Sequence, residues 1–518
     1  MRRLRRLTLA AVGASAYHTL PGARAEHAMG VPAISAVGLS RRPDAPRILS
    51  KDGKLLSARL VQVQAIFRHG ARTPVNDDGC NVDDTRCTWE PAETDKAHER
   101  RAHLALYRPG SGDPIDPAER FAQGSSSRSL IGGGRPGGLT CVGAQQAYEL
   151  GDELRARYVD ADATTSAGVR RDRLLPAGWE RARRLVAARS TCVERTVYTC
   201  AGVLGGLFPE LCESAPAVEV ALNAADGTND AGEYMVLNDA QSPLLHLLFQ
   251  QGLALSTKHL DTEQRAVIAE VEAATGWRID RDEWKLITYR DVYACRRAAG
   301  KPVPAALAGE SSLAARLDAA TAVQMHHIFE GGAAFVPRET PHDGPLAAMD
   351  EASTRAAALR LTIGRLWSRI LDQLSKPDGT LHLMSGHDWS VSPLLMCILR
   401  RDDPLFGHWP PFCSNLAIEL WSTRPSEQDG GGGVLDDSYC YGADASLADE
   451  GRHVRCVYNG AVVRMACASG DGETCTLAEF KRMVRDFAVR DFAAEGRVAS
   501  ADERGAAAEG TATPSFNK

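Results

Sequence analysis

Residues 61–74 read VQVQAIFRHGARTP, and this stretch decides the architecture of the chain. Residues 60–67 alternate and then become continuously apolar, which predicts a buried β-strand. The strand runs into two arginines around a histidine, then a glycine and a closing proline. Open α/β sheets bind ligands at the carboxyl ends of their strands. Arg68 and Arg72 therefore predict an anion site there, because guanidinium groups match phosphate oxygens and stay charged.

Strands and helices alternate along the rest of the chain. Thr140 caps a helical pattern, and a short strand at 185–188 leads into a helix over 191–207. Residues 359–374 carry the apolar stripe of a core-facing helix, and a strand at 381–385 follows. This alternation predicts an α/β fold, with a three-layer core whose central, mainly parallel sheet is flanked by helices.

The pattern changes in the middle of the chain. Between about 211 and 340, helix-like segments are separated by loops containing Pro and Gly, which predicts a smaller, mostly helical cap inserted in the core. The two ends of the chain lack apolar periodicity. The predicted order is a targeting segment, a linker, the first core part, the cap, the second core part and a disordered tail, at residues 1–16, 17–56, 57–210, 211–340, 341–495 and 496–518.

Composition excludes several classes of partner. The 518 residues carry a formal net charge of −6, with 44% hydrophobic and 24% charged residues, as in ordinary globular proteins. The negative balance argues against a nucleic-acid partner. No apolar run reaches the ~18–20 residues of a membrane span. Any strong anion site must therefore be local.

The N-terminus has the features of a targeting segment. Four arginines precede the apolar stretch Leu7–Ala16, which ends in small residues. This order indicates a secretory signal, so we expect a secreted or endolysosomal protein; the absence of acidic residues before Glu26 leaves a mitochondrial presequence as the alternative. Thirteen cysteines without a CxxC pair, and the close pair Cys467 and Cys475, suit disulfides in an oxidising compartment.

The residues around the first motif also predict a chemistry. His69 lies between two cations, which lower the pKa of an imidazole and favour its neutral, nucleophilic form. The strand at 381–385 ends in His387 and Asp388, and the strand at 185–188 ends in Arg189. A phosphomonoester is cleaved when its charge is neutralised and its leaving oxygen is protonated.

Several stretches, in order, resemble the histidine acid phosphatases. RHGARTP resembles the signature motif, and LMSGHDWSVSPLL, at 383–395, resembles the His-Asp motif. Further agreement comes from GGLTCVGAQQAYELGDELRARY, ARSTCVERTVYTCAGVLGGLF, GHWPPFCSNLAIELW and CASGDGETCTLAEF. The resemblance spans roughly residues 57–490, and WPPF and the LTxxG helix make it closest to the lysophosphatidic acid phosphatase type.

The resemblance implies a role for each site residue. Arg68, Arg72 and Arg189 would bind the phosphoryl oxygens, and His69 would attack phosphorus. His387 would help to hold the oxyanion, and Asp388 would protonate the leaving oxygen; mild acid favours a protonated carboxyl. No cofactor and no metal is implied.

The resemblance also implies two disulfides, and the chain departs from the family pattern in places. Cys295 would pair with Cys413, and Cys467 with Cys475. Cys192 follows Arg-Ser-Thr where an acidic or amide residue is usual. Trp389 follows the His-Asp pair where a smaller residue is common, so its indole could line the pocket.

The expected partner is a small-molecule or lipid phosphomonoester, with lysophosphatidate a candidate, and a homodimer is left open. One alternative is a phytase or sugar-phosphate phosphatase. A phosphoglycerate-mutase-like enzyme also begins with Arg-His-Gly, but Arg72-Thr73-Pro74 and His387-Asp388 favour the phosphatase. The remaining alternative, from another class, is a non-catalytic protein that binds phospholigands; such a protein would usually lack the nucleophile or the acid.

Overall fold

The computed structural model describes most of the chain between residues 46 and 498. The described residues are 46–49, 53, 55–75, 87–95, 100–109, 112–116, 129–160, 174–213, 217–222, 233–280, 282–308, 312–336, 346–347, 349–424, 451–467 and 472–498. The predicted targeting segment, most of the predicted linker and nearly all of the predicted tail lie outside these residues.

A mixed sheet forms the centre of the molecule, with strands in the order β10-β9-β8-β2-β7-β5-β6-β3-β4. The five strands β2, β7, β5, β6 and β3 run parallel to one another, and the strands outside them pair antiparallel. Two short strands extend the sheet, β1 on β2 and β11 on β9. The strands are β1 Ile48–Leu49, β2 Leu55–Arg68, β3 Leu104–Tyr107, β4 Pro114–Ile115, β5 Val186–Ser190, β6 Val218–Leu222, β7 Leu381–Gly386, β8 Asn415–Arg424, β9 Arg452–Tyr458, β10 Ala461–Val462 and β11 Thr474–Thr476.

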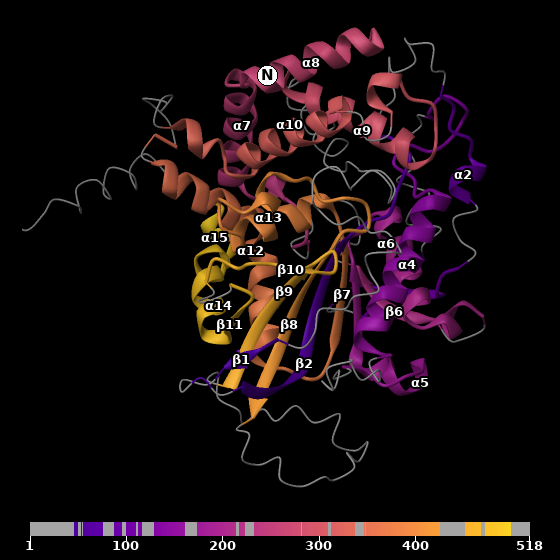
Figure 1. The fold of residues 1–518 in the computed structure, drawn as a ribbon, viewed down its shortest axis with the longest axis vertical. Helices are drawn as coiled ribbons and strands as arrows, with labels where there is room; N and C mark the ends of the chain where they lie inside the picture. The colour runs from indigo at the N-terminus through magenta and orange to yellow at the C-terminus, as the bar shows by residue number, and fades with distance from the viewer. Residues whose placement is uncertain are drawn as a thin grey trace, which may run out of the picture.

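Helices cover both faces of the sheet, as the alternating pattern predicts (Figure 1). Strand β2 shows the cause: Val63, Ala65 and Phe67 pack on one face with α4 and α6, whereas Ile66 packs on the other with α12, α13 and α14. The helices of the first face are α4 Cys141–Tyr158, α5 Trp179–Ala182 and α6 Glu194–Leu207. Those of the second are α12 Glu351–Ser375, α13 Asp388–Ile398, α14 Leu477–Val484 and α15 Phe492–Glu495. The prediction of a three-layer α/β core is confirmed.

The inserted region carries four longer helices, which Figure 1 shows above the carboxyl ends of β2 and β7. They are α7 Pro243–Lys258, α8 Thr262–Thr275, α9 Lys285–Ala298 and α10 Ser312–Phe329. A short helix, α2 Ala92–Asp95, lies between β2 and β3 in the chain. Helices α8, α9 and α10 share a hydrophobic cluster of their own around Val271, Tyr289 and Leu317.

The predicted range of this cap, 211–340, is wrong at its start. Strand β6 lies within that range, yet it pairs in parallel with both β5 and β3 and so belongs to the sheet. Its sequence, VEVAL, carries β-branched residues of which Val218, Val220 and Leu222 are buried, so it packs as a sheet strand. The helical insertion therefore begins after β6.

The predicted cap of α4 is confirmed, and an Asn-Gly pair forms a tight turn. Thr140 caps α4, because its side chain accepts a hydrogen bond from the Gly143 amide. Asn459 and Gly460 both have positive φ, 46° and 83°, as the two-residue turn between β9 and β10 requires. Among the described residues, no helix combines the length and the apolar character needed to cross a bilayer.

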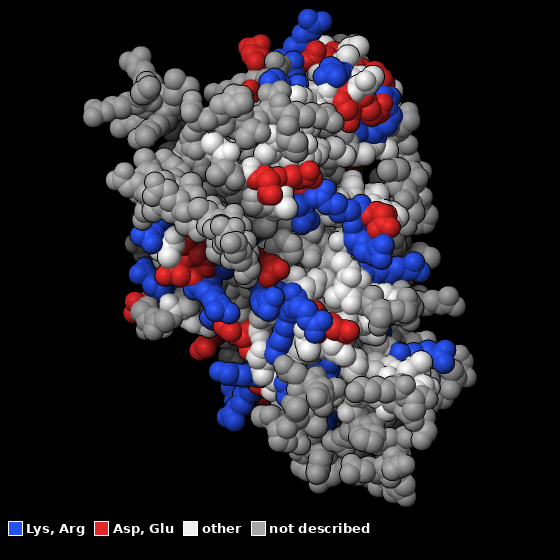
Figure 2. Space-filling model, turned by 90° about the vertical axis from the view of Figure 1, so that its left-hand side faces the viewer, with Lys and Arg blue, Asp and Glu red and all other residues white. Residues whose placement is uncertain are grey.

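Charged groups are mixed on the surface of the molecule. On the face drawn in Figure 2, Lys and Arg side chains alternate with Asp and Glu over the described residues. The described part of this face therefore carries no continuous basic patch.

Candidate active site

The two sequence motifs meet because β2 and β7 are parallel neighbours. Arg68, at the end of β2, is in register with Gly386, at the end of β7. The His69 amide donates a hydrogen bond of 3.0 Å to the Gly386 carbonyl, which fixes the two loops against each other. The histidine rings of His69 and His387 lie edge to face, with centroids 5.6 Å apart. The ends of these strands thus form one site, at the edge where open α/β sheets hold ligands.

The hydrogen bonds of His69 leave one ring nitrogen available. Its Nδ1 donates to the Gly70 carbonyl at 2.9 Å. Its Nε2 is buried and makes no hydrogen bond to any described residue. Because Nδ1 carries the proton, the lone pair lies on Nε2, which is the arrangement of a nucleophilic imidazole.

The surroundings keep this imidazole neutral. Burial, and then the positive charges of Arg195, Arg68 and Arg72, hold the pKa of His69 well below its ordinary value. Burial and the charge of Arg195 also depress the pKa of His387, whose Nε2 lies 2.9 Å from the Thr191 hydroxyl. Both rings therefore remain uncharged in mild acid.

Helix α4 approaches the motif closely enough to fix its backbone. The Ala71 amide donates to Gln146 of α4, and the Gly70 amide donates to Thr199 of α6. A Cβ atom built on Gly70 would lie 2.2 Å from the Gly143 carbonyl oxygen, so a side chain at this position would collide with α4. The glycine of the motif is thus required by packing.

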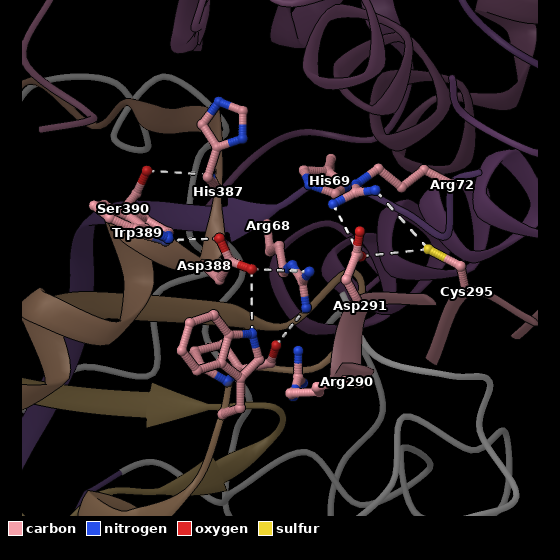
Figure 3. A network of polar contacts seen from close by, with 12 residues as sticks. Arg68, His69, Arg72, Arg290, Asp291, Cys295, His387, Asp388, Trp389 and Ser390 are labelled. Atoms are coloured by element: carbon pink, nitrogen blue, oxygen red, sulfur yellow. Dashed lines mark hydrogen bonds and ion pairs between the residues drawn. The ribbon is translucent and has the colours of Figure 1, made fainter. Parts of the chain in front are cut away.

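Arg68 and Asp388 form a buried ion pair. Arg68 Nη2 lies 2.9 Å from Asp388 Oδ2, and both side chains are 0% exposed. The same carboxylate oxygen accepts a hydrogen bond of 3.1 Å from Trp409 Nε1, while Arg68 Nη1 donates to the Pro410 carbonyl at 2.7 Å (Figure 3). Burial lowers the pKa of Arg68 to about 9, against the opposing effect of Asp388. The acid proposed from the sequence thus lies beside the arginine that precedes the histidine.

Arg72 is anchored by the inserted region. Its Nη2 lies 3.2 Å from Oδ1 of Asp291, on α9, and its Nη1 donates to the Thr73 carbonyl at 2.8 Å. Figure 3 shows Asp291 between Arg72 and Cys295, on the side of the site opposite His387. The sequence pattern gives no separate signal for Asp291, which lies four residues before Cys295.

The third arginine of the site is Arg195, and the prediction of Arg189 is wrong. Arg189 lies on β5 at the register of Met384, with its guanidinium 5.3 Å from the Tyr234 ring centroid. Arg195 is in the first turn of α6, is 6% exposed, and is the strongest charge acting on both His69 and His387. The two side chains differ in direction. Arg189 points to the same face of the sheet as Met384, whereas Arg195 lies after the turn that follows β5, at the ends of the strands.

The sequence contained a signal for Arg195. ERT follows RST by two residues, so two arginines flank the loop between β5 and α6. Strand ends alone do not distinguish them; the first turn of the following helix, where ligands of α/β sheets gather, would have done so. Glu194, next to it, pairs with Arg135 at 2.9 Å and holds the adjoining loop.

The predicted Cys295–Cys413 disulfide is not present. Both thiols are free and lie in different hydrophobic clusters, Cys295 with Cys87 and Trp89, and Cys413 with the α4 and α6 face. Cys295 instead lies 3.6 Å from Asp291 and 3.9 Å from Arg72. Cys467 and Cys475 are also free thiols, but their sulfur atoms are in contact at 2.7 Å.

Trp389 follows the His-Asp pair and is buried in the hydrophobic core. Its ring packs against Phe249 and Phe329, with centroids 5.7 Å and 5.0 Å away, and it is 2% exposed. The bulky residue that departs from the family pattern is therefore part of an aromatic cluster contributed by the cap helices α7 and α10.

A buried neutral imidazole, surrounded by arginines and accompanied by a carboxyl group, is the site of a phosphate-ester hydrolase. The chain belongs to the histidine phosphatase superfamily, branch 2, whose family profile matches residues 59–459. The family predicted from the sequence is confirmed, and the chain is a phosphoric monoester hydrolase of the histidine acid phosphatase type.

Among its relatives, human testicular acid phosphatase (Homo sapiens) is 26% identical over 65% of this chain and 68% of its own length. Bovine lysophosphatidic acid phosphatase type 6 (Bos taurus) is 23% identical over 73% of this chain and 77% of its own. The crystal structure of a phytase from Klebsiella sp. ASR1 covers 87% of this chain and 98% of its own, with 14% identity and a TM-score of 0.46.

Proposed function

We propose that the chain hydrolyses phosphate monoesters through a phosphohistidine intermediate on His69. The observation that carries this proposal is the state of the ring: Nδ1 donates to the Gly70 carbonyl, Nε2 has no hydrogen-bond partner among the described residues, and buried cations keep the imidazole neutral. A neutral nitrogen beside arginines is suited to attack a phosphoryl group whose charge those arginines neutralise.

In the first step, the bond between phosphorus and the leaving oxygen breaks while a bond from Nε2 to phosphorus forms. Arg68, Arg72 and Arg195 contact the non-bridging oxygens, where charge is spread in the transition state. The protonated carboxyl of Asp388 gives its proton to the leaving oxygen, which departs as an alcohol. The Gly70 carbonyl continues to accept from Nδ1 and so stabilises the positive ring.

In the second step, water attacks phosphorus and its proton passes to the Asp388 carboxylate. The bond from phosphorus to Nε2 breaks, inorganic phosphate leaves, and Asp388 is again protonated. The Arg68–Asp388 ion pair of the free protein fits this cycle. Once Arg68 contacts a phosphoryl oxygen, its hold on the carboxylate weakens, and Asp388 can take up the proton that it later donates.

The substrate class in this proposal is a small or lipid phosphomonoester, with lysophosphatidate as a candidate. The relative named a lysophosphatidic acid phosphatase supports the candidate. A panel of lysophosphatidate, glycerol 3-phosphate, a sugar phosphate and phytate tests this choice. A preference for phytate of more than about tenfold, or about 1.4 kcal/mol in transition-state binding, would contradict it.

Turnover of p-nitrophenyl phosphate at about pH 5 tests the reaction itself. We expect wild-type turnover, loss of turnover in His69→Ala, and an acid-labile phosphoryl label on wild-type protein quenched in alkali during turnover. A protein that binds phosphate but releases no nitrophenol would instead be the non-catalytic phospholigand-binding relative.

We also propose secretion into an oxidising compartment, with a Cys467–Cys475 bond formed there. The N-terminal sequence supports the first part, and the contact between the two sulfur atoms supports the second. Intact mass spectrometry of protein from the culture medium, before and after reduction, tests both. Protein retained in cells with both thiols reduced would contradict them.

A further inference from the structure

Arg290 is a fourth arginine at the site, and it comes from the inserted helical region. It lies on α9, next to Asp291, and its side chain is 1% exposed. Its Nε lies 2.9 Å from Oδ1 of Asp318, on α10. Its Nη1 and Nη2 are buried and make no hydrogen bond to any described residue. An arginine that only stabilised the packing of α9 on α10 would normally have these donors satisfied, because an unmade buried hydrogen bond costs roughly 1–3 kcal/mol.

The position of Arg290 is on the side of the site where the leaving group departs. Its guanidinium carbon lies 4.8 Å from the centroid of the Trp409 ring, and Trp409 Nε1 donates to Asp388. Figure 3 shows the end of Arg290 directed toward Arg68 and Asp388. His69 and His387 are influenced most by the other three arginines. Arg290 therefore adjoins the proposed acid, away from the nucleophile.

Arg68 and Arg290 share the negative charge of Asp388, and Arg290 has a second carboxylate neighbour in Asp318. Burial lowers the pKa of Arg290 to about 10, and Arg290 in turn is one of the cations that lower the pKa of Arg68. Two buried guanidinium groups that repel each other are costly unless negative charge lies between or beside them. The transferred phosphoryl group adds negative charge beside Arg68, whereas Nη1 and Nη2 of Arg290 have no hydrogen-bond acceptor among the described residues.

We propose that Arg290 binds a second anionic oxygen group on the leaving group, so that the enzyme selects phosphomonoesters whose alcohol also carries a carboxylate or a second phosphate. This inference rests on the proposed hydrolysis of phosphomonoesters, and within that class it favours small anionic substrates over lysophosphatidate, whose leaving alcohol carries neither group. Nη1 and Nη2 form a fork that matches such a group with two parallel hydrogen bonds, and the Trp409 ring supports the guanidinium from one face. A binding interaction of this kind also orients the ester oxygen toward Asp388.

A matched pair of substrates tests the inference. 3-Phosphoglycerate and glycerol 3-phosphate share one three-carbon skeleton and differ in a carboxylate against a hydroxymethyl group. We expect kcat/KM of the wild type for 3-phosphoglycerate to exceed that for glycerol 3-phosphate by about 10- to 100-fold at constant ionic strength. The bisphosphate and monophosphate of 1,3-propanediol form the corresponding pair for a second phosphate, and show which anion is preferred.

The variants isolate the contribution of Arg290. In Arg290→Gln the ratio should fall toward one, and Arg290→Lys, which keeps the charge but loses the fork, should lie between. Arg297→Gln is the control, since Arg297 is also a buried arginine on α9 whose Nη2 lies 3.8 Å from Asp318. The ratio should stay at the wild-type value in this control.

The outcomes separate this inference from the proposed function. A wild type that hydrolyses p-nitrophenyl phosphate with a ratio near one for both pairs refutes the role of Arg290 alone. A ratio that Arg290→Gln leaves unchanged, or an equal loss on both members of each pair, would make Arg290 a structural residue and also refute it. A wild type that hydrolyses nothing refutes the phosphatase proposal, and this inference with it. If Arg290→Gln fails to fold, the wild-type ratio and the ratio of Arg290→Lys still test the inference: a wild-type ratio near one, or equal ratios in wild type and Arg290→Lys, refutes it.

Discussion

Replacing each of the two arginines that flank the loop between β5 and α6, one at a time, tests whether the phosphate-binding arginine is Arg195, as the structure indicates, or Arg189, as the sequence predicts. Arg195→Met removes the strongest charge acting on His69, in a position that is 6% exposed. Arg189→Met removes a cation that lies over the Tyr234 ring, 5.3 Å from its centroid. Methionine preserves most of the length of each side chain, so packing changes little.

The expected magnitudes differ by two orders. Removing one preorganised donor to a developing anion costs about 2.7–4 kcal/mol in transition-state stabilisation, so Arg195→Met should lose roughly 10²–10³ in kcat/KM. A cation–π contact is worth about 0.5–1 kcal/mol, and Arg189 does not act on either histidine strongly, so Arg189→Met should stay within about fivefold of wild type.

The assay combines steady-state hydrolysis of p-nitrophenyl phosphate at about pH 5 with inhibition by inorganic phosphate. NMR titration of the His69 ring gives an independent readout, because loss of a neighbouring cation raises the pKa of an imidazole. The pKa of His69 should rise in Arg195→Met and stay low in Arg189→Met. Thermal melting of both variants controls for folding.

Two results would refute the reasoning. One is a loss in Arg189→Met that equals or exceeds the loss in Arg195→Met. The other is an Arg195→Met protein with unchanged phosphate inhibition and an unchanged pKa of His69, because the guanidinium would then not face the phosphoryl group.

Three further predictions concern the acid, a cap histidine and the packing of α4. Asp388→Asn should lose roughly 10²–10⁴ in kcat on glycerol 3-phosphate and much less on p-nitrophenyl phosphate, whose leaving oxygen needs little protonation; equal losses would show that Asp388 is not the proton donor. Burial lowers the pKa of His326 to about 3. Below about pH 6.5 the unfolded chain therefore binds a proton at this residue that the folded chain does not bind, and the free energy of unfolding decreases by about 1.4 kcal/mol for each unit by which the pH is lowered. His326→Phe should therefore recover about 2–3 kcal/mol between pH 7.5 and 4.5 in urea unfolding, and a slope equal to that of wild type would contradict the buried neutral state. A Cβ on Gly143 would lie 2.0 Å from the Ala71 carbonyl oxygen, so Gly143→Ala should lower the free energy of unfolding by about 1–3 kcal/mol and should lower kcat. The control is Gly178→Ala at an exposed position where a Cβ meets nothing within 4 Å, so this variant measures only the backbone cost of alanine at a positive φ.

The local features of the core follow from the sequence because short-range physics determines them. The alternation of residues 60–67 fixes β2, the hydroxyl of Thr140 fixes the start of α4, and Asn459-Gly460 fixes a turn. His69, Arg68 and Arg72 come together because they are neighbours in one loop. His387 and Asp388 join them because parallel strands end on the same edge of a sheet.

The misjudged features depend on contacts between distant segments. Which of Arg189 and Arg195 faces the site depends on how the loop after β5 turns. Strand periodicity leaves both open, and only the position of Arg195 in the first turn of the following helix favours it. Strand β6 was assigned to the cap because its five residues stand alone between loops, and only pairing with β3 and β5 makes them part of the sheet. The Cys295–Cys413 pairing was taken from the resemblance, and α9 places Cys295 against Asp291 instead.

One turn of α9 carries both the partner of Arg72 and the unpaired fork of Arg290, and this has a consequence for how the family can diversify. An α-helix advances about 100° per residue, so one inserted residue ahead of Tyr289 would rotate both side chains off the strand ends at once. Insertions and deletions in the connections of the cap should therefore be tolerated only in combinations that restore the helical phase at Arg290 and Asp291. A change in the length of this region therefore also changes the positions of Arg72 and Arg290, so substrate preference cannot change through loop length alone without affecting phosphate binding.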